Sequence, residues 1–110
     1  MMRILFDQGT PDGIRDSLVG HTVKSAWEQG WDRLANGELL KAAEEADFDV
    51  LVTTDQALPH QQNLSARKIG VVILTEANWR LTKAVLPQIV AAVLAAKPGT
   101  VSVVAFPSRK

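Results

Sequence analysis

The clearest predicted strand in the chain is Phe48-Asp49-Val50-Leu51-Val52-Thr53-Thr54, which ends at Asp55. A strand that faces solvent on one side alternates apolar and polar residues, but here Val50, Leu51 and Val52 follow one another without a polar residue. Such a strand must bury both faces, which is typical of the middle of a parallel sheet with helices on each side. We therefore predict a central strand that ends at Asp55.

The rest of the chain alternates further strands with helices. Apolar or alternating runs predict strands over 3–6, 21–26, 70–74 and 101–106, with 21–26 at an edge and 108–110 as a tail. Cap residues and helical spacing predict helices over 10–18, 36–46, 58–68 and 79–96. Thr10 and Asn36 are the expected caps, and Gly13 weakens the first helix. Pro59 interrupts the third, and Pro87 lies near the start of the fourth or at a kink. Strand–helix alternation predicts a three-layer α/β fold: an open, mostly parallel sheet with helices on both faces and right-handed crossovers.

Composition narrows the classes of protein. The chain has 110 residues, which predicts a single domain over 1–110. Twelve basic and twelve acidic residues give a formal net charge of zero. This argues against a protein that coats nucleic acid non-specifically, because such binding depends on an excess of Lys and Arg. There is no cysteine, and this rules out thiolate zinc sites and cysteine nucleophiles. Arg3 and Asp7 interrupt the N-terminal apolar residues, so we expect no signal peptide there. No apolar stretch reaches the length that a membrane-spanning helix needs. We expect a cytoplasmic protein with no membrane association.

Two acidic residues follow strands directly. Asp7 comes after the strand 3–6, and Asp55 comes after the central strand. Ligands of open parallel sheets bind outside the carboxyl ends of the strands, so the two carboxylates meet at one edge if their strands are neighbours. A cation would relieve their repulsion, and Mg²⁺ accepts a site with one or two carboxylates. The competing interpretation is that each aspartate only caps a turn or a helix.

Other side chains are candidates around this pair. Glu38, in the first turn of the helix that Asn36 begins, could bind the metal directly or through water, or could only complement the helix dipole. Asn36 could supply a neutral oxygen ligand, and Gln56 and His60 could contact substrate or the metal ligands. The three tryptophans could stack on bases, although we expect each to pack; they are Trp27, Trp31 and Trp79. Four cations could reach phosphates or could be solvated helix ends; they are Arg67, Lys68, Arg80 and Lys83.

Four short motifs carry a resemblance to a known family. They are Ile-Leu-Phe-Asp-Gln-Gly-Thr-Pro at 4–11, Gly-His-Thr-Val at 20–23, Asn-Gly-Glu-Leu-Leu at 36–40 and Val-Leu-Val-Thr-Thr-Asp-Gln at 50–56. In this order the chain resembles, over about residues 1–96, the small PIN-like proteins of bacteria. The resemblance implies a ribonuclease that depends on Mg²⁺ or Mn²⁺, often the toxin of a toxin–antitoxin pair. RNA is then the substrate, and an antitoxin protein is an expected partner.

The resemblance also implies where the acidic residues lie. It matches Asp7 to the acid after the first strand, Glu38 or the position of Asn36 to the acid at the second helix, and Asp55 to the acid after the Thr-rich strand. A fourth acid is common just beyond that strand in larger members, but Gln56 follows here. This departure argues against a two-metal site and leaves a one-metal site.

Three hypotheses follow. The leading one is a metal-dependent, toxin-like endoribonuclease with catalytic and metal-binding roles for Asp7, Glu38 and Asp55. The second is an inactive PIN-like module that binds RNA or a partner protein without cleavage. The third is a receiver-like phosphoacceptor, which would need an acid pair after the first strand and a lysine after the last. The apolar C-terminal helix and the tryptophans allow either a homodimer or a monomer.

Overall fold

The structure, a computed structural model, describes residues 1–106; the expected tail at 108–110 lies outside them. Its elements in chain order are β1 (Arg3–Phe6), the 3-10 helix η1 (Asp12–Ser17), β2 (Thr22–Ser25), α1 (Asn36–Glu45), β3 (Val50–Thr53), α2 (Leu58–Gln61), the 3-10 helix η2 (Leu64–Ala66), β4 (Gly70–Leu74), α3 (Trp79–Ala84), α4 (Leu86–Ala95) and β5 (Val101–Val104). Strands and helices alternate, as the sequence predicts.

The five strands form one sheet in the order β2-β1-β3-β4-β5, and every pair is parallel. The predicted central strand, β3, is the middle strand, and the predicted edge strand, β2, is at an edge. The chain moves from β1 to one neighbour and later returns to the other side of β1. The topological switch point therefore lies between β1 and β3, where doubly wound sheets bind their ligands.

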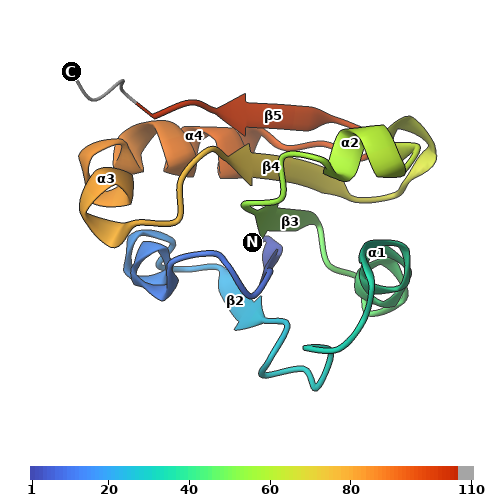
Figure 1. Ribbon diagram of the computed structural model, residues 1–110. Coiled ribbons are helices and arrows are strands. Elements are labelled where there is room, and N and C mark those ends of the chain that lie inside the picture. The colour runs from blue at the N-terminus through green and yellow to red at the C-terminus, as the bar shows by residue number, and fades with distance from the viewer. Residues whose placement is uncertain (107–110) are drawn as a thin grey trace.

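Helices cover both faces of the sheet, so the molecule has three layers, as predicted (Figure 1). On one face, alternate strand residues such as Phe6 and Val52 pack against η1 and α4. On the other face, residues such as Leu5 and Leu51 pack against α1 and α2. All four residues of β3 are buried, which is the reason for its uninterrupted apolar run.

Two predicted helices differ in the structure. The helix expected over 79–96 is divided into α3 and α4 at Val85, and Pro87 lies in the first turn of α4, where a missing N–H costs nothing. The helix expected over 58–68 is only the four-residue α2, followed by η2. Pro59 is again in a first turn, so it starts α2 rather than interrupting it.

Thr10 is not the cap of the first helix. The residue before η1 is Pro11, and the buried Thr10 hydroxyl instead donates to the carbonyl of Val52 at 2.8 Å. The Thr10 N–H also bonds to the carbonyl of Asp7 at 3.0 Å. These bonds fasten the loop after β1 to β3, so the loop that carries Asp7 is held against the neighbouring strand.

No helix within residues 1–106 is long and apolar enough to cross a membrane.

At the sheet edge opposite β2, the side chains of Val101 and Val103 on β5 are exposed.

Candidate functional site

Asp7 and Asp55 follow the adjacent strands β1 and β3, on either side of the switch point. The Asp7 N–H donates to the carbonyl of Val52 at 2.9 Å and extends the pairing of the two strands to their carboxyl ends. Both aspartates are partly exposed. The sequence prediction that neighbouring strands bring these two residues to one edge is therefore confirmed.

A buried hydroxyl joins the two aspartates. Thr53, the last residue of β3, is 0% exposed, and its Oγ1 donates to Oδ2 of Asp7 at 2.8 Å. The same oxygen accepts the backbone N–H of Asp55 at 3.1 Å. Thr53 thus fixes the Asp7 carboxylate relative to the backbone of Asp55, and the sequence prediction did not include it.

The Asp55 carboxylate has its own partners. Its Oδ2 accepts the side-chain amide of Asn36 at 2.7 Å, and Oδ1 accepts the N–H of Ala57 at 3.0 Å. The Asn36 amide also donates to Oε1 of Gln61 at 3.0 Å. Asn36 is the first residue of α1 and Ala35 is the cap, so the predicted capping role is wrong. Asn36 presents its nitrogen to Asp55 and orients that carboxylate.

Glu38 has a structural partner. It is exposed, and its Oε1 accepts the backbone N–H of Ala35 at 3.0 Å, which closes the first turn of α1. No group of three His, Asp or Glu side chains within residues 1–106 is arranged to hold a metal ion. The structure therefore brings together Asp7, Asp55 and Asn36, while Glu38 caps its own helix.

Gln56 and His60 are also exposed, in the turn after Asp55 and in α2. The structure shows no side-chain hydrogen bond from either residue to the two aspartates.

A pocket of about 370 Å³ adjoins Asp7 on the β2 side. It opens between the loop after β1 and the loop after β2. Its lining combines two apolar side chains with five polar ones and contains no basic residue: Phe6, Asp7, Gln8, Thr10, Asp12, Ser25 and Trp27.

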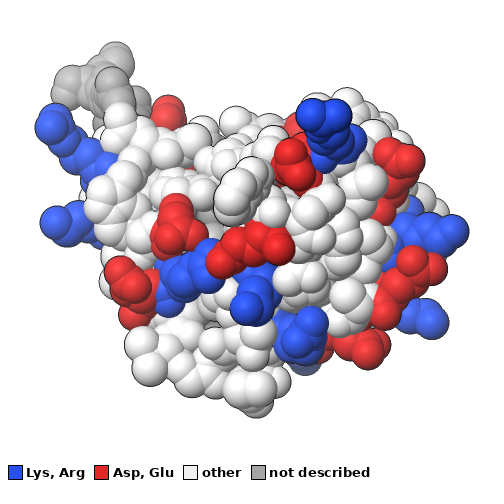
Figure 2. All heavy atoms as spheres, turned by 90° about the horizontal axis from the view of Figure 1, so that it is seen from below, with Lys and Arg blue, Asp and Glu red and all other residues white. Residues whose placement is uncertain are grey.

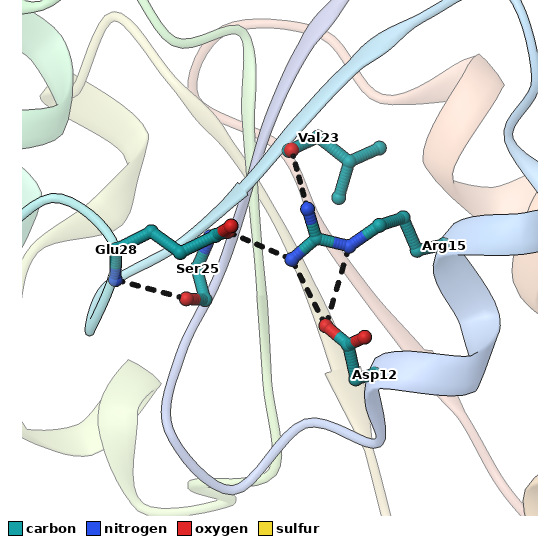
Figure 3. Close-up of polar contacts among 5 residues, drawn as sticks. All are labelled: Asp12, Arg15, Val23, Ser25 and Glu28. Carbon is teal, nitrogen blue, oxygen red and sulfur yellow. Dashed lines mark hydrogen bonds and ion pairs between the residues drawn. The ribbon is translucent and has the colours of Figure 1, made fainter.

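A network centred on Arg15 holds the walls of this pocket (Figure 3). Arg15 donates to Oδ1 of Asp12 at 2.9 Å, to Oε1 of Glu28 at 2.8 Å and to the carbonyl of Val23 at 3.0 Å. Glu28 in turn accepts the N–H of Ser25 at 2.8 Å, and its own N–H donates to the Ser25 hydroxyl. One guanidinium thus connects η1 to the end of β2.

The charges in this network stabilise one another. The hydrogen bond from Arg15, with a further one from the Ser25 backbone, lowers the pKa of Glu28 from 4.5 to about 2. The hydrogen bond to Glu28 raises the pKa of Arg15 above its ordinary value, against the effect of burial. Both groups are therefore charged at neutral pH, and the guanidinium is already occupied by its partners.

The tryptophans differ in their surroundings. Trp31 packs edge-on against Phe48 with ring centroids 6.0 Å apart, and Trp79 lies against Gly13. For Trp31 the expected packing is confirmed, whereas Trp79 is still 40% exposed. Trp27 follows the edge strand β2 and is 71% exposed, so it is not buried within this chain, and its packing at an interface stays a prediction.

The candidate phosphate-binding cations do not form a basic patch. Arg67 pairs with Glu44 at 2.7 Å, and the N–H of Lys68 bonds to the same carboxylate. Burial alone would raise the pKa of Glu44, but these hydrogen bonds outweigh it and lower the pKa. Arg80 and Lys83 are exposed on α3. Figure 2, which views the molecule from the β2 side, shows acidic and basic side chains interleaved.

A receiver-like phosphoacceptor would place a lysine after the last strand. In the described part of the chain, β5 is followed by Ala105 and Phe106, and neither can fill that role. Thr75, after β4, uses its hydroxyl to accept the N–H of Phe106 at 3.0 Å. The site therefore gives this hypothesis no support.

No family model, curated protein or solved structure matches the chain. The resemblance to PIN-like proteins stays a prediction that rests on the sequence motifs.

Sequence reasoning missed Thr53 and Arg15. Thr53 is a hydroxyl residue at the end of an apolar strand and next to an acidic turn, which was a usable signal. For Arg15 the local pair with Asp12, three residues earlier, was a weak signal, but its partner Glu28 is brought to it only by the pairing of β1 with β2.

Proposed function

We propose that this chain is a metal-dependent endoribonuclease of the PIN-like type, in which Asp7 and Asp55 bind Mg²⁺ or Mn²⁺. The observation that supports this most is the placement of two aspartates at the switch point of a doubly wound sheet, where the buried hydroxyl of Thr53 links the Asp7 carboxylate to the backbone N–H of Asp55. This is the region where such sheets carry their reactive groups.

The donor set fits a hard divalent cation. Each of the four carboxylate oxygens of Asp7 and Asp55 accepts one hydrogen bond, from Gln8, Thr53, Ala57 or Asn36. A carboxylate oxygen has two lone-pair positions, so each oxygen can accept a further partner. Mg²⁺ is commonly held by one or two carboxylates with water and phosphate as its other ligands. The pair is therefore sufficient without Glu38.

The remaining residues orient these carboxylates. Thr53 restrains Asp7 through a buried hydrogen bond, and Asn36 restrains Asp55 from the start of α1. Such partners fix the rotamers of metal ligands and tune their basicity. When bound, a divalent ion would neutralise charge on a phosphodiester and lower the pKa of a coordinated water. Since no lysine or arginine lines the pocket beside Asp7, charge neutralisation by an ion is the main attraction that this side of the site offers the RNA backbone.

The decisive variant is Asp7→Asn. It keeps the shape of the side chain, so the hydrogen bonds to Gln8 and Thr53 can persist in altered form, but it removes the charge. We expect cleavage of single-stranded RNA in Mg²⁺ or Mn²⁺ to fall by more than about 100-fold, with an unchanged circular dichroism spectrum. The matched control is Asp47→Asn, an exposed aspartate at φ 62° between α1 and β3, a backbone conformation that asparagine tolerates.

Cleavage should be measured as the appearance of fragments from a labelled oligonucleotide, with EDTA as a second control. Undiminished cleavage by Asp7→Asn, or equal losses in Asp7→Asn and Asp47→Asn, would remove the proposed mechanism. In the toxin setting that the resemblance implies, expression of the wild type should arrest bacterial growth and Asp7→Asn should not.

A specific observation favours a second candidate, a binding module without activity. Glu38 is committed to Ala35, and within residues 1–106 no third acidic side chain joins Asp7 and Asp55 in a metal-binding group, so the site has fewer acidic residues than the resemblance implies. Such a module would bind RNA or a partner protein. Tight RNA binding without cleavage, in Mg²⁺ and Mn²⁺ alike, would support it and exclude the nuclease.

A further inference from the structure

The pocket beside Asp7 is a second candidate binding site next to the two aspartates. Its volume of about 370 Å³ is in the range of small-ligand sites. Asp7 belongs both to the pocket and to the proposed metal pair. A group that fills the pocket therefore lies next to the bond on which the proposed reaction acts.

Trp27 supplies an aromatic wall. Its side chain is 71% exposed, while that of Trp79 is 40% exposed and lies over Gly13. A large aromatic surface left in water at the rim of a pocket is available for stacking, and nucleobases stack on such rings with little dependence on sequence. Of the three tryptophans, Trp27 is the one that lines the pocket.

The pocket is organised before any ligand binds. Asp12 on one wall and Ser25 on the other are both connected to Arg15, directly or through Glu28 (Figure 3). A site held in place in this way loses less conformational entropy on binding. Because Arg15 is used in these bonds, it is not free to bind a phosphate.

The polar lining determines which ligand fits. Asp7 and Asp12 are carboxylates that accept hydrogen bonds, Gln8 can both donate and accept, and no lysine or arginine lines the pocket. A phosphate would be repelled, whereas a planar base with amino hydrogens would be accepted. Adenine, cytosine and guanine carry such an amino group, and uracil does not.

We propose that this pocket is a nucleobase subsite, in which Trp27 stacks on a base of single-stranded RNA and the Asp12 and Gln8 side chains favour bases with an amino group. The choice of RNA as the polymer rests on the proposed function; the stacking itself does not. The subsite holds a nucleotide next to the scissile phosphodiester and contributes to binding rather than to the chemistry of cleavage.

The first test uses uncharged nucleosides in metal-free buffer, so that phosphate repulsion and cleavage play no part. In ¹H–¹⁵N spectra of the whole chain, adenosine up to about 10 mM should shift the indole N–H signal of Trp27 saturably, with smaller shifts from uridine. The indole signals of Trp31 and Trp79 are internal controls and should move little. No saturable shift at Trp27, or equal shifts of all three signals, would overturn the proposal. A response to arginine amide but not to adenosine would do so as well, by assigning the pocket to a basic side chain of a partner protein.

The second test uses single-stranded hexanucleotides and fluorescence anisotropy. Trp27→Ala should weaken binding of oligoadenylate roughly tenfold or more, and Trp27→Phe should retain most of the affinity. Val19→Ala, which shortens an apolar side chain that is 86% exposed and lies before β2, is the control and should bind like the wild type. Equal affinity of Trp27→Ala and Val19→Ala would contradict the subsite.

The two proposals fail in different ways. If the nuclease proposal is wrong, the wild type does not cleave RNA or Asp7→Asn cleaves it equally well, but Trp27 still responds to adenosine. If the subsite is wrong, Asp7→Asn abolishes cleavage while Trp27→Ala binds oligoadenylate normally.

Discussion

At the scale of single residues, local partners decide what each acidic side chain can do. Glu38 and Asp7 both stand at sequence positions where a metal ligand is expected. In the structure, Glu38 accepts the backbone N–H of Ala35, whereas the Asp7 carboxylate is oriented by the hydroxyl of Thr53. A carboxylate in a first helical turn has unpaired N–H groups beside it, and these compete for its oxygens. A carboxylate at a strand end projects beyond the sheet and remains available.

A prediction at this scale concerns the pH dependence of stability. The hydrogen bond from Arg15 lowers the pKa of Glu28 from 4.5 to about 2 in the folded protein. The contribution of ionised Glu28 to the free energy of unfolding is therefore complete above about pH 4.5 and is lost as the pH falls toward 2. Because the Glu28 side chain is 40% exposed, solvent screening should keep this contribution below about 1 kcal/mol.

The measurement is urea denaturation of the wild type and Glu28→Gln across this range. The variant should be less stable near neutral pH, and the difference should shrink as the pH falls. Glu45→Gln, at an exposed position of α1, controls for the loss of a surface carboxylate. A difference that is constant from pH 7 to the acid limit would show that the Arg15 pair does not act through ionised Glu28.

Among the elements, η1 and α3 approach each other closely on the face of the sheet opposite α1. An added Cβ at Gly13 would lie 2.6 Å from Cη2 of Trp79, so the indole ring lies directly over the glycine. In the sequence, Gly13 only weakens a helix. In the structure it allows an element from the N-terminal half to contact one that is more than sixty residues later.

Gly13→Ala should therefore destabilise the fold by about 1 kcal/mol, since the added methyl group must displace the Trp79 ring, which is 40% exposed and can move outward. Gly20→Ala is not a clean comparison, because Gly20 has φ 90°. The better control is the double variant Gly13→Ala with Trp79→Ala, in which the collision is absent and the cost of the added methyl group should disappear. Thermal unfolding followed by circular dichroism measures both, and a harmless Gly13→Ala would contradict the contact.

At the scale of the whole molecule, the proposed ion would link β1 and β3 in the folded state only. Since the two aspartates are far apart in the unfolded chain, an ion bound at about 100 times its dissociation constant should add about 2.7 kcal/mol to the free energy of unfolding. Mn²⁺ should therefore raise the melting temperature by several degrees.

This stabilisation should be lost in Asp7→Asn and retained in Asp47→Asn, as measured by calorimetry with and without EDTA. The same rise in wild type and Asp7→Asn would place the ion elsewhere on the chain. A homodimer stays a prediction, and sedimentation of the same samples measures it directly.

Three features could be predicted from the order of residues: the α/β class, the central strand that ends before Asp55, and the positions of Asp7 and Asp55 directly after strands. These follow from hydrophobic periodicity and local residue preferences, which act over a few neighbours and can be recognised from the order of residues alone. The helix boundaries predicted from the sequence were less accurate. A proline can either begin a helix in its first turn or interrupt one, and the sequence around Pro59 and Pro87 does not distinguish the two.

Which neighbours each side chain has depends on how the whole chain folds. The fold places β1 next to β3, brings Thr53 to Asp7 and Asn36 to Asp55, and leaves Trp27 exposed beside a pocket. Hydrogen bonds and packing between residues that are distant in the chain depend on strand order and register, and no local pattern encodes these. The chemistry of this site therefore depends on the order of the strands as much as on the residues that follow them.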